Sequence, residues 1–400
     1  MSKTTLAFLG GDPAFSTALH VGRPNIGDRD AFMRRVEEIL DRRWLTNSGP
    51  VVTEFEEKLA EQLQVSDVIA VCNATVGLEL ATRALGMSGE VIVPSFTFIA
   101  TAHALQWQET SPVFADIRKH DHNIDPLAIE ALITEKTSGI LAVHCWGRPV
   151  DIEALNVVAK RHNLKLLFDA SHAFACDYHG QPVGGFGEAE VFSFHATKFI
   201  NALEGGCIST NNPELAEELR YMRNFGFRGY DDVGFLGVNG KMNEISAAMG
   251  LTNLESLERL IAVNRENFDS YQQAFADFPG LQFLPAPEND AFNYQYVVAE
   301  IYEEECPLAR DELIDVLWEE NIFIRRYFYP GCHRMEPYRS QSSTNDRQLP
   351  ETDAVCSRVL VFPTGETVNG DAIRQVSGIM FQAIEQAKEV KLAIEKRSNA

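Results

Sequence analysis

The sequence lacks a long uninterrupted hydrophobic run, and it has few cysteines for its length. None of its apolar stretches reaches the roughly 18 residues of a membrane-spanning helix, so we expect no membrane partner. Its seven cysteines are odd in number and show no C-x-x-C spacing, which argues against a disulfide framework and a zinc site. These absences predict a cytoplasmic protein with reduced thiols and no metal centre.

Positive charge is also scarce. The chain has 35 basic and 57 acidic residues, which gives a formal net charge of −22. Such a charge repels nucleic acids at long range, so an anionic ligand would need a local binding site. With 400 residues and 45% hydrophobic content, the chain is long enough for two domains with sizeable cores.

Residues 68–170 contain short apolar runs rich in valine, isoleucine and leucine, separated by segments with helical spacing. The runs are VIAVCNA, GEVIVPSF, SPVFADI, SGILAVHCW and LKLLFDA. This alternation predicts an α/β fold with a parallel sheet covered by helices on both faces. Beyond residue 250 the pattern changes to a long helical stretch (251–278), strand-like runs at 293–301 and 321–330, and helices at 309–320 and 371–392. We therefore expect a large domain over residues 1–255 and a smaller α+β domain over residues 256–400.

Two polar residues follow apolar runs at positions where a parallel sheet binds its ligands. Asp169 ends LKLLFDA, and Lys198 comes 29 positions later, after AEVFSF. A lysine and a carboxylate in one cleft suit pyridoxal phosphate, because the lysine forms a Schiff base and the carboxylate keeps the pyridine nitrogen protonated. Taken alone, Asp169 is more typical of a helix cap or a turn, and a single lysine is usually a surface charge.

Other residues could complete such a site. The turn at Asn73–Thr75 begins a predicted helix, where the N–H groups of Ala74 and Thr75 could hold a phosphate, with Ser193 adding a hydroxyl. Phe98 could stack on a pyridine ring, although it could also be a core residue of its helix. His172 lies three residues after Asp169, a helical interval that would direct both side chains to one ligand, and His195 is a candidate for proton transfer. A nicotinamide site is not supported, because FLGG lacks the full G-x-G-x-x-G pattern.

These stretches resemble the DegT/DnrJ/EryC1/StrS family of sugar aminotransferases. The similarity covers nearly the whole chain, from FLGGDPAF through WLTNSGPVVTEFEEKLA, VIVPSFTFIATAHA, FDASHAFACDY, VFSFHATKFINALEGG and KMNEISAAMG to RRYFYPGCHRMEPY and LVFPTG. It implies the fold of type I pyridoxal-phosphate enzymes, with a mostly parallel seven-stranded sheet and a smaller C-terminal domain. It also implies a homodimer with shared active sites.

The resemblance assigns roles residue by residue. Lys198 matches the lysine that binds the cofactor, Asp169 the partner of the pyridine nitrogen, and His172 a residue beside the phenolic oxygen. Ala74, Thr75 and Ser193 match phosphate contacts, and Phe98 matches the aromatic residue on the ring. Asn243 matches an asparagine that reaches the phosphate in the neighbouring subunit, although it could also simply cap a helix.

The motif SFHATKFINALEGG, together with RRYFYPGC, is most similar to members that aminate C4 of dTDP-4-keto-6-deoxyglucose. The implied donor is L-glutamate, which leaves as 2-oxoglutarate, with pyridoxamine phosphate as the intermediate form of the cofactor. Amination at C3, a GDP- or UDP-linked sugar, and a non-catalytic regulatory relative remain alternatives. In the segment 325–333, Tyr329 and His333 are candidate substrate contacts, unless this segment is a strand edge packed against a partner.

Overall fold

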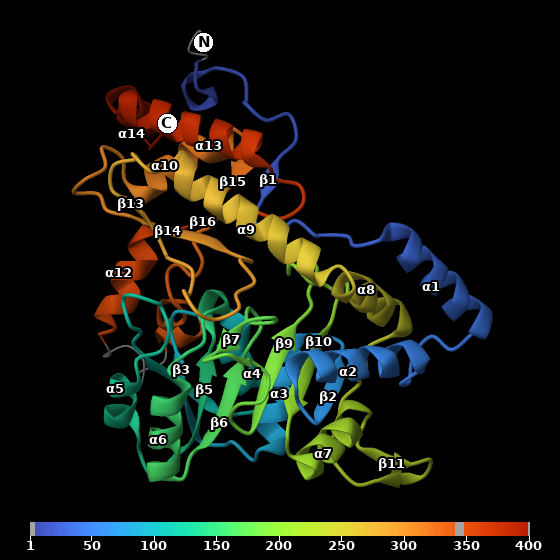
Figure 1. Ribbon diagram of the computed structural model, residues 1–400. Helices are drawn as coiled ribbons and strands as arrows, with labels where there is room; N and C mark the ends of the chain where they lie inside the picture. The colour runs from blue at the N-terminus through green and yellow to red at the C-terminus, as the bar shows by residue number, and fades with distance from the viewer. Residues whose placement is uncertain (1–4, 341–347, 399–400) are drawn as a thin grey trace.

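The computed structural model describes residues 5–340 and 348–398 of the chain (Figure 1). Its helices are α1 (Arg29–Arg42), α2 (Pro50–Leu63), α3 (Ala74–Ala84), α4 (Ile99–Trp107), α5 (Pro126–Ile129), α6 (Ile152–His162), α7 (Pro213–Arg223), α8 (Glu244–Leu254), α9 (Leu257–Ala274), α10 (Arg310–Glu319), α12 (Pro350–Arg358), α13 (Gly370–Glu385) and α14 (Ala387–Ser398). In this part of the chain, no helix is both long and apolar enough to cross a membrane.

A seven-stranded sheet with the order β2-β10-β9-β6-β5-β3-β4 forms the centre of the larger region. Its strands are β2 (Asp67–Val71), β3 (Glu90–Pro94), β4 (Ser111–Ala115), β5 (Thr137–Val143), β6 (Lys165–Asp169), β9 (Ala189–Ser193) and β10 (Gly206–Thr210). Only β10 runs against its neighbours, since it is antiparallel to both β2 and β9 while the other pairs are parallel. The carboxyl ends of the other six strands therefore meet at one edge.

Side chains alternate between the two faces of this sheet, and each face is covered. In β2, Val68 and Ala70 belong to a hydrophobic cluster with α2 and α8, whereas Ile69 and Val71 pack with α3, α4 and α7. This period of two is what a strand buried on both faces requires. The predicted α/β architecture is confirmed, and β2 to β6 coincide with the five apolar runs.

A second region contains the antiparallel sheet β13-β14-β16, formed by Leu281–Phe283, Val297–Ile301 and Val359–Phe362. Its hydrophobic cluster joins α9, α10 and α13. The N-terminal segment belongs to the same cluster through Leu6, Phe8 and Leu19, and β1 (Leu19–His20) pairs with β15 (Ile322–Phe323). Figure 1 shows this segment beside α13 and α14, so the residues from Leu6 onward pack with the C-terminal region. The boundary near residue 255 stays a prediction.

Some predicted elements were wrong in extent. The helix expected over 251–278 is divided into α8 and α9 at Ser256, whose hydroxyl donates to the Thr252 carbonyl at 3.3 Å and so competes with the helical hydrogen bonds. The strand expected over 321–330 is limited to β15, because the chain then turns its aromatic residues towards a cavity. The closing helix is two helices, α13 and α14. The sequence reading did not identify α7, α12, β10 and β16.

Candidate active site

A cavity of about 550 Å³ opens at the carboxyl edge of the large sheet. Eight of the eleven predicted site residues line it: Ala74, Thr75, Phe98, Asp169, His172, Ser193, His195 and Lys198. They come from four separate segments of the chain, each of which follows a strand or begins a helix at this edge. The structure thus brings together most of the residues that the sequence singled out.

Lys198 provides an amine inside this cavity. It lies in the turn after β9, and its Nζ donates a hydrogen bond of 3.3 Å to the hydroxyl of Tyr296. Burial lowers the pKa of Lys198 to about 8, although the nearby charge of Asp169 acts in the opposite direction. An amine with such a pKa is far more often neutral, and so nucleophilic, than a surface lysine at the same pH.

Asp169 is the last residue of β6 and is 5% exposed. Its Oδ2 accepts a hydrogen bond of 2.8 Å from the Thr101 hydroxyl, and its Oδ1 accepts one of 3.1 Å from the Ser171 N–H. Two donors hold the carboxylate in one orientation towards the cavity. A buried anion fixed in this way can pair with a protonated ring nitrogen.

The start of α3 also lines the cavity. The Asn73 side chain caps the helix by accepting from the Val76 N–H at 2.9 Å, while the Ala74 and Thr75 N–H groups have no acceptor among the described residues. A Cβ added at Gly206 would lie 2.7 Å from the Ala74 nitrogen, so only glycine lets β10 come this close. Asn73 therefore caps α3, and two helix-terminal amides remain available for an anion.

Aromatic side chains form the walls. Phe98 precedes α4, is 56% exposed and lines the cavity, so it is not a core residue of that helix. On the other side, His172 lies parallel to Phe328, with ring centroids 5.9 Å apart and an angle of 4°. Residues 170–176 form turns rather than the helix that the spacing suggested, but Asp169 and His172 still reach the same cavity.

His195 lines the cavity and is partly exposed. Its Nδ1 is 2.8 Å from the Thr197 hydroxyl, and its Nε2 is 3.4 Å from a carboxylate oxygen of Glu204. Its side chain is 45% exposed, which places it where a substrate enters rather than beside the Lys198 amine.

Three predicted residues do not line this cavity. Asn243 is exposed and caps α8 by accepting from the Ser246 N–H at 2.9 Å, so the alternative capping role is confirmed. His333 is only 7% exposed, with its Nδ1 2.6 Å from the Ser95 hydroxyl and its Nε2 3.3 Å from Asp353. This network fixes the segment after β15 to the end of β3, and the structure does not present His333 to a substrate.

Tyr329, the third of them, belongs to an adjoining hollow of about 310 Å³. This hollow shares Thr97, Phe98, Tyr327 and Phe328 with the main cavity and also contains Arg325 and Arg326. The guanidinium carbon of Arg326 is 4.9 Å from the centre of the Tyr329 ring. Cations and aromatic faces next to the main cavity are suited to phosphates and a planar base.

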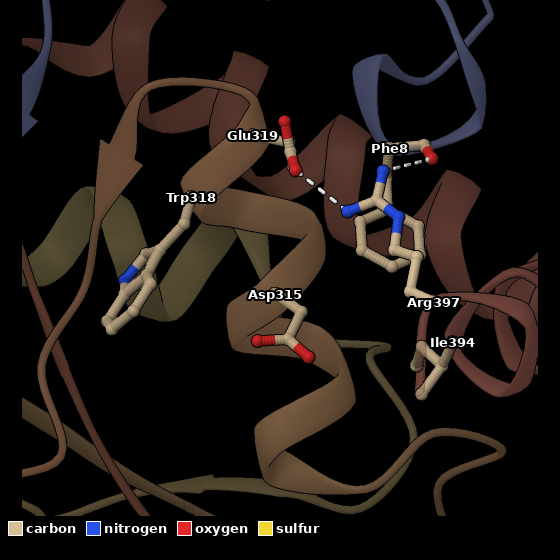
Figure 2. A pocket seen from close by; sticks show the side chains of 6 residues that line it. All are labelled: Phe8, Asp315, Trp318, Glu319, Ile394 and Arg397. Carbon is tan, nitrogen blue, oxygen red and sulfur yellow. Dashed lines mark hydrogen bonds and ion pairs between the residues drawn. The ribbon is translucent and has the colours of Figure 1, made fainter. Parts of the chain in front are cut away.

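Another hollow, of about 480 Å³, lies between η1 (Ala7–Leu9), α10 and α14 (Figure 2). Its one guanidinium, on Arg397, donates to Glu319 at 2.8 Å and to the Phe8 carbonyl at 3.1 Å. None of the predicted site residues lines it. Because its cation is already paired, this hollow is less suited to an anionic ligand than the main cavity.

Sequence reasoning missed several residues of the site, including Thr101, Tyr296 and Phe328. Thr101 is the third residue of α4, within FIATAHALQW. A threonine near the start of a helix is common and does not by itself indicate a site. Tyr296 and Phe328 come from the C-terminal region, and their approach depends on how the two regions pack. Local pattern carries no signal for that contact.

Comparison with known proteins agrees with this geometry. The sequence profile described as the DegT/DnrJ/EryC1/StrS aminotransferase family matches residues 27–381. The dTDP-4-amino-4,6-dideoxy-D-glucose transaminase of Shigella dysenteriae is 36% identical over 359 residues, which cover 90% of this chain and 97% of that protein. The protein of the same name from Escherichia coli is 35% identical over 365 residues, with the same coverage.

Solved structures give the same result. The crystal structure of DesI in the presence of its TDP-sugar product has a TM-score of 0.92 and 44% identity, covering 98% of this chain and 99% of that one. PseC of Helicobacter pylori, an aminotransferase involved in pseudoaminic acid biosynthesis, has a TM-score of 0.85 and 28% identity, with 92% and 100% coverage. The predicted type I fold and the predicted family are confirmed. The chain belongs to the DegT/DnrJ/EryC1/StrS aminotransferase family and is a sugar aminotransferase.

Proposed function

We propose that the protein uses pyridoxal phosphate to move an amino group from L-glutamate to C4 of dTDP-4-keto-6-deoxyglucose. The observation that carries this proposal is the buried Lys198 amine, which shares one cavity with the fixed carboxylate of Asp169. The relatives named dTDP-4-amino-4,6-dideoxy-D-glucose transaminase support the choice of sugar and nucleotide. The donor, the cofactor contacts and the two-subunit site come from the family resemblance.

The residues present fit the cofactor at each of its ends. Ala74 and Thr75 offer free amides to the phosphate, and Ser193 ends β9 beside them in the same cavity. Asp169 would pair with the ring nitrogen, and Phe98 would cover the ring. When bound, the cofactor supplies an electron sink for the carbanion formed next to the amino group.

The chain's own residues would manage the proton. The Lys198 amine, with a pKa of about 8, would take up and return a proton near neutral pH. The Tyr296 hydroxyl, 3.3 Å from the amine, keeps it directed into the cavity. Asp169, held in place by its two donors, would pair with a positive charge on the ring nitrogen.

The hollow with Arg325 and Arg326 would receive the nucleotide part of the sugar substrate. It adjoins the main cavity, so a sugar near Lys198 could extend its diphosphate towards the two guanidinium groups. This local positive charge would offset the repulsion expected from a net charge of −22. Tyr329, with Arg326 against its ring, would stack on the base.

We also propose a homodimer with shared active sites. Exposed apolar side chains are frequent in α1 and around β11 (Phe227–Gly229) and β12 (Asp232–Val233), and Tyr230 between these two strands is fully exposed. Contiguous exposed apolar surface is typical of an interface. Asn243, exposed at the start of α8, would reach the phosphate bound in the partner subunit.

Assays of the purified protein with L-glutamate and a panel of dTDP-, UDP- and GDP-linked 4-keto sugars would test the substrate. We expect the dTDP sugar to be aminated at C4, as seen by NMR of the product. Lys198→Ala should abolish turnover, and Asp169→Ala should lower it by about 10² to 10⁴ while leaving partial cofactor binding. Near-normal turnover of Asp169→Ala, or product aminated at C3, would contradict the assignment.

Mixing a Lys198→Ala variant with an Asn243→Ala variant would test the shared site. A Lys198→Ala subunit paired with an Asn243→Ala subunit rebuilds one complete site if Asn243 acts on the partner. After the two variants are unfolded and refolded together, turnover per subunit that carries Lys198 should exceed that of the Asn243→Ala variant alone. Sedimentation measurements would report the oligomeric state directly.

A further inference from the structure

Trp146 lies next to the cavity and has an uncommon backbone conformation. Its φ and ψ are 62° and 14°, in the left-handed region that bulky residues rarely adopt, and it is 1% exposed. Such a conformation persists only where surrounding contacts hold it. The contacts of Trp146 therefore indicate what this conformation is used for.

The indole ring is fixed by a hydrogen bond and by stacking. Its Nε1–H donates to the Nδ1 of His122 at 3.1 Å. The ring lies parallel to Phe328 at 5.1 Å and to His172 at 6.1 Å, with angles of 14° and 13°. Both of these neighbours line the cavity, so the indole packs directly behind its wall.

The buried carboxylate of Glu300 sets the direction of the hydrogen bond between Trp146 and His122. The Nε2 of His122 is 3.2 Å from Glu300, whose other oxygen accepts from Arg358 at 2.8 Å. Burial raises the pKa of Glu300, but the hydrogen bonds from His122 and Arg358 outweigh it, so the pKa lies below its usual value. Burial lowers the pKa of His122. A carboxylate can only accept, so neutral His122 carries its proton on Nε2 and leaves Nδ1 for the indole.

The main-chain N–H of Trp146 forms a hydrogen bond with His172. Its N–H donates to the Nδ1 of His172 at 3.3 Å. Burial lowers the pKa of His172 well below its usual value, and the charge of Lys198 adds to this effect. A neutral imidazole that accepts at Nδ1 carries its proton on Nε2. No acceptor for this proton is present among the described residues, and the side chain lines the cavity.

We propose that Trp146, anchored by His122 and Glu300, is a positioning residue that fixes His172 as a neutral hydrogen-bond donor towards the cavity. The donor would meet an oxygen of the bound cofactor, and this last step rests on the proposed function. A neutral donor adds no positive charge beside Lys198, so the amine keeps its lowered pKa.

The same chain contains a comparable histidine with no free donor. His144 accepts from the Val150 N–H at Nδ1, at 3.1 Å, and its Nε2 lies 3.2 Å from the buried Glu190. Both sides of this ring are therefore satisfied inside the core. His172 differs in that its Nε2 is left for a ligand, which is the feature that the proposal explains.

Long-range proton–nitrogen NMR of the cofactor-free protein, labelled with ¹⁵N-histidine, tests the proposal. His172→Gln identifies the signals of His172. We expect His172 to be neutral between pH 6 and pH 9, with its proton on Nε2. Trp146→Phe keeps the stacking but removes the indole donor, and it should give mixed protonation of the two nitrogens and about fivefold weaker binding of pyridoxal phosphate.

Tyr271→Phe is the matched control, because it also removes one buried aromatic donor, to the Pro363 carbonyl at 2.9 Å, far from the cavity. It should leave both measurements unchanged. A proton on Nδ1 of His172 in the wild-type protein would overturn the proposal, even if Trp146→Phe does not fold. So would a Trp146→Phe variant that matches the control. If only the proposed function is wrong, the wild-type protein should fail to bind pyridoxal phosphate, while the nitrogen signals of His172 should still show the proton on Nε2.

Discussion

The amine of Lys198 lies 3.3 Å from the hydroxyl of Tyr296, which is 98 positions later in the chain. Lys198 follows β9 of the large sheet, whereas Tyr296 immediately precedes β14 of the second sheet. The reactive amine is therefore held between the two regions. Its environment depends on how they pack together as well as on the sheet that carries it.

Replacing Tyr296 by phenylalanine removes the acceptor of the Lys198 hydrogen bond. The ammonium form loses a partner while burial is unchanged, so the pKa of Lys198 should fall further below about 8, by about half to one unit. The rate at which cofactor-free protein takes up pyridoxal phosphate follows the neutral amine, so its pH midpoint should move down. Tyr221→Phe, which removes an exposed hydroxyl bonded to Glu217, should not move the midpoint.

The stability of the cofactor-free protein should depend on pH because of Lys198. Its pKa is about 8 in the folded chain and 10.5 without burial, so the unfolded state binds more protons between these values. The free energy of unfolding should rise as pH increases from about 8 to 10.5, by up to roughly 3 kcal/mol. Lys198→Met should lose this rise and be more stable than the wild-type protein at pH 7. Urea unfolding at pH 7, 8.5 and 10 would measure the free energy of unfolding at each pH. The same increase with pH in both proteins would contradict the prediction.

Thr101→Val should weaken the site without disrupting the fold. The change removes the 2.8 Å hydrogen bond to Asp169, and a bond to a charged group is worth about 1.5 to 3 kcal/mol. Asp169 would then be held less firmly, so turnover should fall by about tenfold or more. Thr110→Val is the control, because that buried hydroxyl makes only long bonds of 3.4 Å, to the Met87 and Gln108 carbonyls outside the site. Equal effects of the two changes on turnover would refute a role for Thr101 in the site.

The sequence predicted those parts of the site that depend on local pattern. Asp169 and Lys198 follow apolar runs that became neighbouring strands, and parallel strands bring their carboxyl ends to one edge. The turn before α3 was likewise readable from its small residues. These are short-range signals, and they located most of the cavity lining.

The remainder of the site depends on long-range packing. Tyr296 and Phe328 reach the cavity because β14 and the segment after β15 pack against the large sheet, and no periodicity records that contact. The placement of His333 depends on Ser95 in the same way. The N-terminal residues join the C-terminal core through β1 and β15, a pairing of two-residue strands that is too short to give a pattern.

Arg397→Ala should loosen the last helix without affecting catalysis. In Figure 2 the guanidinium joins Glu319 on α10 to the Phe8 carbonyl, and its carbon is 4.1 Å from the centre of the Phe8 ring. The ion pair is half-exposed and contributes little, so we expect a loss of about 1 kcal/mol in total. Limited proteolysis should release α14 more readily, with unchanged turnover. Arg374→Ala, which removes an exposed pair with Asp371, should do neither.

Phe98→Ala distinguishes a binding residue from a structural one. Phe98 is 56% exposed at the start of α4, so its removal should cost little stability. If it covers the cofactor ring, pyridoxal phosphate should bind about three- to tenfold more weakly, since an aromatic contact is worth roughly 0.5 to 1.5 kcal/mol. Trp107→Ala, at the other end of the same helix and 76% exposed, removes a larger ring outside the cavity and should leave binding unchanged. Fluorescence titration with the cofactor, together with thermal unfolding of both variants, would separate the two effects. A lower melting temperature with unaltered affinity in Phe98→Ala would show that this ring stabilises the fold and does not bind the cofactor.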